Sequence, residues 1–220
     1  RAMRALERGA AKAGACRSRP RFHFLPRSGW INDPNGTLFH EGVYHLFYQH
    51  NPHDICWGPM HWGHATSTNL IEWTHHPIAL APDSLGMIFS GSAVTDEHDT
   101  AGFGAGAVVA AFTYHRDDRE TQALASSTDG GKTFAKFAGN PVLAGPDCQK
   151  DFRDPKIIRF GGARGHWVML LAVGSQVWIY TSHDLRSWTQ TDTVDSTDAD
   201  LGVWETPELF ELVADDGTAH

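Results

Sequence analysis

The sequence predicts an all-β protein built from repeated four-stranded units, the arrangement of a β-propeller. A polar turn that ends in an aromatic residue recurs three times, starting at residues 67, 127 and 182, so that the starts are 60 and 55 residues apart. An apolar run rich in Val, Phe, Tyr and Leu precedes each turn, at residues 43–48, 107–114 and 167–173. Such runs are typical of strands, and four short strands in a repeat of this length are typical of a propeller blade. A two-sheet sandwich would also contain short strands, but it would not explain the recurrence.

Before the first repeat, residues 1–20 form a basic N-terminal segment, and residues 21–220 form the β region. The first 27 residues carry eight Lys or Arg side chains against the single acid Glu7. We expect a short helix over about residues 2–15, which Gly9 and Gly14 weaken. The segment lacks the apolar core of a secretory signal. This predicts a cytoplasmic protein if Arg1 is the natural start, and a secreted one if an upstream piece is missing.

Charge and composition exclude several classes of partner. The formal net charge is −8 and the isoelectric point about 5.9, which disfavours nucleic acid and anionic membranes. No apolar run approaches the ~20 residues that a membrane helix needs. The eight Trp residues fit a sugar-binding protein, because aromatic rings stack on the C–H faces of sugars. The sequence specifies no oligomeric state.

The three cysteines, Cys16, Cys56 and Cys148, are odd in number and widely spaced. This pattern gives neither a disulfide framework nor a C-x-x-C metal motif. We therefore expect them to be free, buried thiols.

Three of the four expected units open with an acid just before a proline or one residue earlier: Asp33, Asp154 and Glu205. The first two are 121 residues apart, or two repeats, and the last two are 51 apart, or one repeat. The second unit has Ser90-Gly91-Ser92 at this place. Equivalent positions of a radial repeat surround one axis, so the acids are expected to meet at the mouth of the central channel.

Converging carboxylates repel one another, so the pKa of one is raised while its neighbours stay ionised. Glycosidases need this combination, because one carboxylate attacks and one carboxylic acid protonates the leaving oxygen. Carboxylate triads also bind Ca²⁺ or Mg²⁺, but a D-x-D-x-D ligand set is absent, and we expect no metal and no cofactor. Alone, an Asp-Pro pair is usually a turn. Trp30, Trp57 and Trp62 would likewise be core residues, but the set at repeat spacing favours a functional site.

Residues 30–36 read W-I-N-D-P-N-G, and with them the chain resembles glycoside hydrolase family 32, whose signature is W-x-N-D-P-N-G. The likeness covers about residues 21–212. Further matching motifs follow in the family's order at residues 47–52, 57–65, 89–92, 152–156 and 204–210.

The resemblance implies a five-bladed propeller that is normally followed by a β-sandwich. Residues 21–220 would be the N-terminal part of this catalytic propeller, about three and a half blades, with the sandwich absent. Residues 1–220 alone are expected to show little or no sucrose hydrolysis, because an open propeller exposes the faces between its blades.

The resemblance also implies the roles of individual residues. Asp33 corresponds to the nucleophile, Glu205 to the general acid/base and Asp154 to the transition-state stabiliser. The family often has Cys after its acid/base glutamate, where this chain has Thr206. The residues implied to bind fructose are Trp30, Asn32, Gln49, Trp57, Phe89, Ser90 and Arg153.

The implied function is retaining exo-hydrolysis of terminal non-reducing β-D-fructofuranosides such as sucrose, levan or inulin. Residues 149–151 and 202–203 favour levanase and exo-inulinase types. A fructosyltransferase shares all three acids and is one alternative. A non-catalytic fructan-binding propeller is another.

Overall fold

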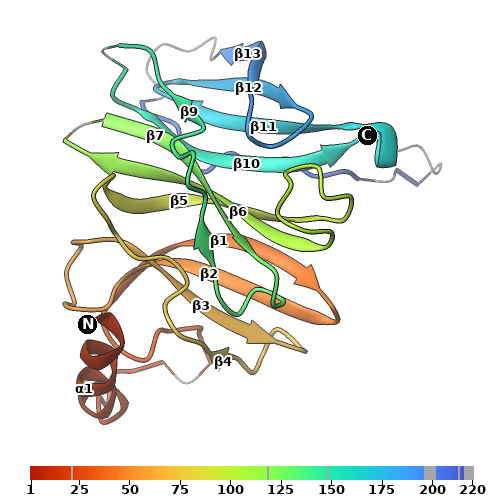
Figure 1. Cartoon of the computed structure of the whole chain (residues 1–220). Coiled ribbons are helices and arrows are strands. Elements are labelled where there is room, and N and C mark those ends of the chain that lie inside the picture. The colour runs from red at the N-terminus through yellow and green to blue at the C-terminus, as the bar shows by residue number, and fades with distance from the viewer. Residues whose placement is uncertain (21, 118, 148, 196–201, 213, 216–220) are drawn as a thin grey trace.

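The computed structural model describes residues 1–220 except 21, 118, 148, 196–201, 213 and 216–220, and it confirms the all-β prediction. Three antiparallel sheets lie one above the other in Figure 1. The first sheet contains β1 (Trp30–His40), β2 (Val43–Asn51), β3 (His61–Ser67) and β4 (Thr74–His75). The second contains β5 (Met87–Asp96), β6 (Ala107–Arg116), β7 (Arg119–Ser127) and β8 (Ala135–Lys136), and β9 (Leu143–Ala144) also pairs with β7. The third contains β10 (Phe152–Phe160), β11 (His166–Val173), β12 (Gln176–Ser182) and β13 (Thr189–Asp195).

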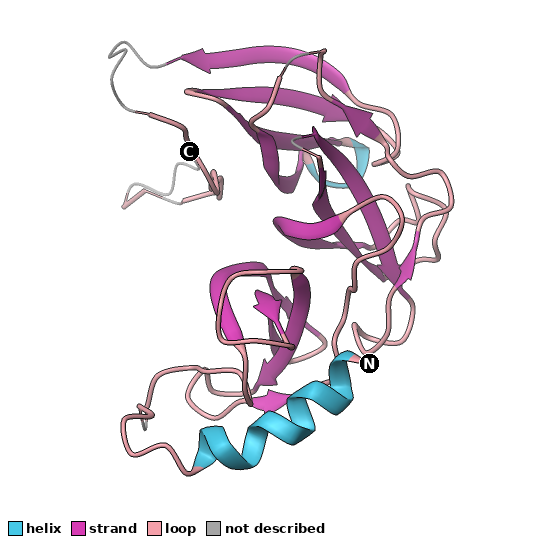
Figure 2. Cartoon of the chain, turned by 90° about the vertical axis from the view of Figure 1, so that its left-hand side faces the viewer, coloured by secondary structure: helices cyan, strands magenta, loops and turns pink. Residues whose placement is uncertain are grey.

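Apart from β9, which is an addition that pairs back with β7, each sheet is a meander in which four successive strands pair in chain order. The three apolar runs are its second strands, β2, β6 and β11. The three recurring turns join its third strand to its fourth. The repeated unit predicted from the sequence is therefore present, and Figure 2 shows the sheets following an arc.

The recurring turns share one set of hydrogen bonds. Ser67 Oγ accepts from the backbone N–H of Asn69, and Asn69 Oδ1 accepts from the N–H of Glu72. Ser182 and Asp184 repeat this pairing in the third sheet, as Ser127 and Asp129 do in the second. Short polar side chains thus replace the backbone partners that the chain loses on leaving the strand.

Two hydrophobic clusters hold the sheets together, one on each face of β6. Alternate residues of a strand point to opposite faces. Val109 and Ala111 accordingly join a cluster with the third sheet, whereas Val108, Ala110 and Phe112 join a cluster with the first. The second sheet is therefore covered on both faces, which rules out the two-sheet sandwich.

The N-terminal helix α1 (Ala2–Gly14) lies next to the first sheet (Figure 1). It is attached through Leu6, which is buried and whose carbonyl accepts a hydrogen bond from Ser28 Oγ at 3.1 Å. A short 3-10 helix, η1 (Gly162–Arg164), precedes β11. Among the described residues, no helix has the length and apolar character needed to cross a membrane.

The expectation of buried thiols is wrong for Cys16 and Cys56, which are both free and exposed. Both lie in loops rather than in a sheet. Cys148 lies outside the described residues.

Candidate active site

The first strand of each sheet carries a β-bulge at its motif. In β1, Ile31 and Pro34 are three residues apart, whereas their partners in β2, His50 and Tyr48, are two residues apart. The same one-residue excess occurs in β5 between residues 88 and 91, and in β10 between residues 153 and 156. A bulge re-aims a side chain and tolerates a proline in a strand, which accounts for the Asp-Pro pairs. Asp33 and Ser90 are the second residues of their bulges and Asp154 is the first, so these positions match to within one residue.

One pocket of about 420 Å³ lies at these bulges. Nine of the ten residues predicted from the sequence line it, and they come from all three sheets and from the segment that carries Glu205. The pocket is lined by Asn32, Asp33, Gln49, Trp57, Phe89, Ser90, His115, Glu120, Lys150, Asp151, Arg153, Asp154 and Glu205.

Trp30 is the predicted residue that does not line the pocket. Its indole N–H donates to Asn32 Oδ1 at 2.9 Å. Trp30 therefore orients a pocket residue. The W-I-N-D-P-N-G motif could not distinguish these two roles, because both place Trp30 beside the site.

Asp33 is oriented by the second sheet. Ser90 Oγ donates to Asp33 Oδ2 at 2.7 Å, although the two residues lie 57 positions apart. The next residue, Gly91, has no room for a side chain, because a Cβ there would collide with the carbonyl oxygen of Ala111. Glycine at this position lets β5 approach β6 closely enough to bring Ser90 to the carboxylate.

Three rings form an aromatic wall of the pocket. Phe89 stacks on His115 with centroids 4.4 Å apart and planes 5° apart, and Trp57 meets Phe89 edge-on at 6.1 Å. Trp57 is 53% exposed, so its ring is open to a ligand. Such rings suit the apolar C–H face of a sugar.

Asp154 is the buried acid of the site, with 6% of its surface exposed. Its backbone is left-handed, with φ of 61°, and its N–H donates to Thr113 Oγ1 at 3.1 Å. Burial is the largest cause, and together with the charges of Asp33 and Glu205 it raises the pKa of this carboxyl from the usual 3.8 to about 6. The N–H of Thr206, which donates to Asp154 Oδ2 at 2.9 Å, and the charge of Arg153 act in the opposite direction. A pKa raised by repulsion between converging carboxylates is expected for the general acid of the site. The raised pKa lies instead on Asp154, the implied transition-state stabiliser, and its largest cause is burial.

Glu205 does not lie on a strand, so the expected opening of a fourth unit near Trp204 contains no strand within 202–212. Contacts with the third sheet hold this irregular segment. The N–H of Trp204 donates to the carbonyl of Gly174 at 2.8 Å, and Lys156 pairs with Glu208 at 2.6 Å. The side chain of Glu205 is 64% exposed and accepts a hydrogen bond from Arg153 Nη2 at 3.1 Å.

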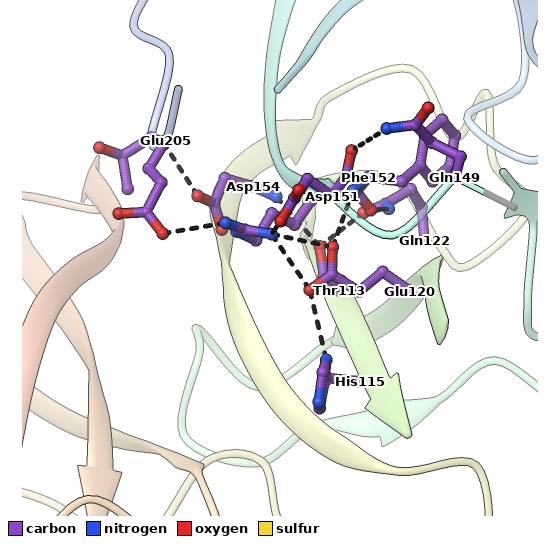
Figure 3. Close-up of polar contacts among 11 residues, drawn as sticks. Thr113, His115, Glu120, Gln122, Gln149, Asp151, Phe152, Asp154 and Glu205 are labelled. Atoms are coloured by element: carbon purple, nitrogen blue, oxygen red, sulfur yellow. Dashed lines mark hydrogen bonds and ion pairs between the residues drawn. The ribbon is translucent and has the colours of Figure 1, made fainter. Parts of the chain in front are cut away.

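Four pocket residues were not predicted from the sequence: His115, Glu120, Lys150 and Asp151. His115 lies near the end of β6 and pairs with Glu120 near the start of β7. Figure 3 shows their side chains facing each other. The only sequence signal was the position of residues 150 and 151 just before the Arg153-Asp154 motif. Among the described residues, no group of three or more His, Cys, Asp or Glu side chains could hold a metal ion.

Comparison with known proteins agrees with this geometry. The family model described as "Glycosyl hydrolases family 32 N-terminal domain" matches residues 23–220. A levanase from Bacillus subtilis (strain 168) is 48% identical over 201 residues, which cover 90% of this chain and 29% of the levanase.

Two solved structures are similar in fold and in sequence. A fructofuranosidase from Schwanniomyces occidentalis complexed with fructose has a TM-score of 0.83 at 34% identity, covering 94% of this chain and 42% of that one. A β-fructofuranosidase from Bombyx mori has a TM-score of 0.82 at 41% identity, covering 96% of this chain and 45% of that one. The chain thus spans less than half the length of these relatives. From its matched residues and its fold, the chain belongs to glycoside hydrolase family 32.

Proposed function

We propose that this chain carries the site of a retaining exo-hydrolase that releases terminal non-reducing β-D-fructofuranosyl units from sucrose, levan or inulin. In the first step Asp33 attacks the anomeric carbon while Glu205 protonates the departing oxygen. In the second step Glu205 takes a proton from water, which releases fructose with its configuration retained. Asp154 holds ring hydroxyls by hydrogen bonds that strengthen as the ring flattens toward the transition state.

The observation that carries this proposal is the convergence of three acids from distant parts of the chain in one pocket. Asp33 comes from β1, Asp154 from β10 and Glu205 from the segment after β13. Each carboxylate has a separate partner: Ser90 for Asp33, Thr206 for Asp154 and Arg153 for Glu205. The aromatic wall beside them suits the C–H face of a sugar ring.

The relatives support the substrate class and the completed fold. Their names are levanase and fructofuranosidase, and one of them is described with fructose bound. We infer that the three sheets are the first blades of a five-bladed propeller. In such a propeller, the segment that holds Glu205 leads into the fourth blade.

The test is the variant Asp33→Asn in the protein that carries this chain. Replacing a nucleophilic carboxylate with an amide should lower kcat for sucrose by about a thousandfold or more. Asp192→Asn is a matched control, because Asp192 lies on β13, is exposed and is not among the pocket residues. In the unsubstituted protein, NMR of fresh product should show β-fructofuranose before mutarotation.

Undiminished hydrolysis by Asp33→Asn would contradict the proposal, as would release of the α-anomer first. Glucose in large excess over free fructose at high sucrose concentration would indicate a fructosyltransferase instead. Fructan binding without any turnover would indicate a non-catalytic binding protein.

A further inference from the structure

Glu120 is a buried acid that the roles proposed above do not use. It lies near the start of β7, with only 4% of its surface exposed. Its Oε2 accepts the backbone N–H of Phe152 at 2.7 Å, and its Oε1 lies 3.3 Å from His115 Nδ1. A neutral glutamine oxygen could accept the same N–H. Because burying a charge is costly unless it is paired, the charge of Glu120 calls for a partner of its own.

That partner is Arg153, whose guanidinium lies between carboxylates on two sides. Nη1 is 3.3 Å from Glu120 Oε2 and 2.6 Å from Asp151 Oδ1, and Nη2 donates to Glu205 at 3.1 Å. Partial burial lowers the pKa of Arg153, but the hydrogen bonds and charges of Asp151, Glu120 and Glu205 raise it above its ordinary value. The guanidinium is planar, so fixing one of its nitrogens fixes the direction of the other.

Glu205 depends on this support more than the other two acids do. It is exposed and lies on a segment without regular structure, whereas Asp33 and Asp154 lie on paired strands. Among the described contacts, the hydrogen bond from Arg153 is the one that reaches its carboxylate. Figure 3 shows Glu205 on one side of this network and Glu120 on the other, with Asp151 between them.

Glu120 also reaches the side of the pocket that holds Asp33. His115, which contacts Glu120, stacks on Phe89, and the residue after Phe89 is the Ser90 that orients Asp33. The β6–β7 hairpin thus touches supports of both reacting carboxylates. Toward Glu205, Glu120 is linked through its ion pair with Arg153.

We propose that Glu120 is a positioning residue for Glu205 and acts through Arg153. This assignment rests on the proposed function, in which Glu205 protonates the leaving oxygen as the C–O bond breaks and Asp33 bonds to the anomeric carbon. Loss of the Glu120 charge frees Arg153 to turn toward Asp151 alone. Glu205 then delivers its proton from a poorer position, although the pocket itself is intact.

Two substrates with different leaving groups separate this role from a structural one. Sucrose needs a proton on its departing oxygen, whereas an aryl fructoside such as 4-nitrophenyl β-D-fructofuranoside releases a stable phenolate without one. Because general acid catalysis contributes about 10²–10⁴-fold, we expect Glu120→Gln to lower kcat/KM for sucrose at least about tenfold more than for the aryl fructoside. The ratio of the two rates in one preparation is independent of how much of the protein is folded.

Asp96→Asn is the matched control. Asp96 is a buried acid on the same sheet, and it accepts hydrogen bonds from the N–H groups of Thr100 and Ala101, away from the pocket. This variant should change both rates by the same factor. Glu120→Asp, which keeps the charge, should recover part of the sucrose rate.

A second readout is rescue by azide, which attacks the fructosyl intermediate without needing a general base. Azide should speed turnover of the aryl fructoside by Glu120→Gln, with fructosyl azide as product, and should not do so for Asp96→Asn. Equal losses on both substrates, or no loss on either, would overturn the role of Glu120 while leaving the proposed function in place. Failure of the unsubstituted protein to hydrolyse either substrate would overturn the proposed function and this assignment with it.

Discussion

Two features of Asp154 are unfavourable to the stability of the fold: its left-handed backbone and its buried carboxyl. The backbone conformation is rare for residues with a Cβ, and the burial disfavours the ionised form. Such costs are tolerated where a site needs a group in one orientation. Here the conformation places the carboxyl in the pocket and the N–H on Thr113.

The raised pKa of Asp154 predicts how stability changes with pH. The folded-state pKa is about 6, above the usual 3.8, so ionising Asp154 destabilises the folded state. This destabilisation is absent below about pH 4 and complete above about pH 6. Asp154→Asn removes this cost, which is about 3 kcal/mol at most for a shift of about two units. We therefore expect the variant to melt at a higher temperature than the unsubstituted protein at pH 7.5. The gain should vanish by pH 4, as thermal unfolding across this range can show.

Asp184→Asn should behave in the opposite way. Burial alone would raise the pKa of Asp184, but hydrogen bonds from the N–H groups of Ser187 and Arg186 lower it. Its replacement should therefore reduce stability at neutral pH, with a loss that shrinks as the pH falls. A pH-independent change in both variants would contradict the two assignments.

At this scale the sequence identified the acids but not their environment. Asp33, Asp154 and Glu205 could be predicted because they recur in motifs near prolines. Glu120 could not, since an acid near a hairpin normally faces solvent, and its partners Phe152 and Arg153 lie more than 30 positions further along the chain. The difference between Trp30 and Trp57 likewise depends on which ring faces the pocket, and that is set by packing.

Among the elements, β5 and β10 are joined by one hydroxyl. Ser92 Oγ donates to the carbonyl of Pro155 at 2.7 Å and accepts the N–H of Ile157 at 2.9 Å. It therefore satisfies two backbone groups of a neighbouring sheet, next to the bulge that carries Asp154. No strand pairing links these two sheets in the described part of the chain.

Ser92→Ala should weaken this junction, because it leaves a buried carbonyl and a buried N–H without their partner. Each such group costs about 1–3 kcal/mol, so we expect the free energy of unfolding to fall by about 2–4 kcal/mol. Urea titration measures this loss. Ser126→Ala on β7 is the control, since that serine is only partly buried and should change stability by less than about 0.5 kcal/mol. Equal effects of the two substitutions would show that the Ser92 bridge contributes nothing.

The strands and turns were predictable because their signals are local. Apolar runs gave β2, β6 and β11, and the Ser-x-Asn/Asp pattern gave the turns, in which side chain and backbone are close neighbours. The bulges were not predicted, because a bulge is a mismatch between two strands and neither strand shows it alone. The missing strand near Trp204 has the same origin, since a strand requires a partner.

For the whole molecule, β6 is the element on which both clusters depend. All but two of its ten residues are buried, and its alternating side chains supply the interface with the first sheet and the interface with the third. A strand buried on both faces has no polar side, so its sequence is nearly continuous in apolar residues. This is the packing expected when blades stack around an axis.

Phe112→Ala tests this dependence. The ring is fully buried against the first sheet, 6.2 Å from the ring of Trp62, so its removal should cost about 3–5 kcal/mol of unfolding free energy. Phe160→Ala on β10 is the control, because Phe160 is 59% exposed. Denaturant unfolding should show a large loss for the first variant and little change for the second. A small loss for Phe112→Ala would mean that the first two sheets are held together by something other than this cluster.

Because of the three matching bulges, mostly different residues of β1, β5 and β10 pair the strands and line the pocket. β1 has a second irregularity between Asn35 and Leu38. Among the paired residues of β1, β5 and β10, Arg153 lines the pocket and the others do not. The residues within the bulges, among them Asn32, Phe89 and Asp154, face the pocket instead. Bulge residues that line the pocket can therefore change without changing the residues that pair the strands. Substitutions at a few bulge positions can change which sugar is recognised while the sheets stay the same. The same positions are suitable for randomisation in protein design.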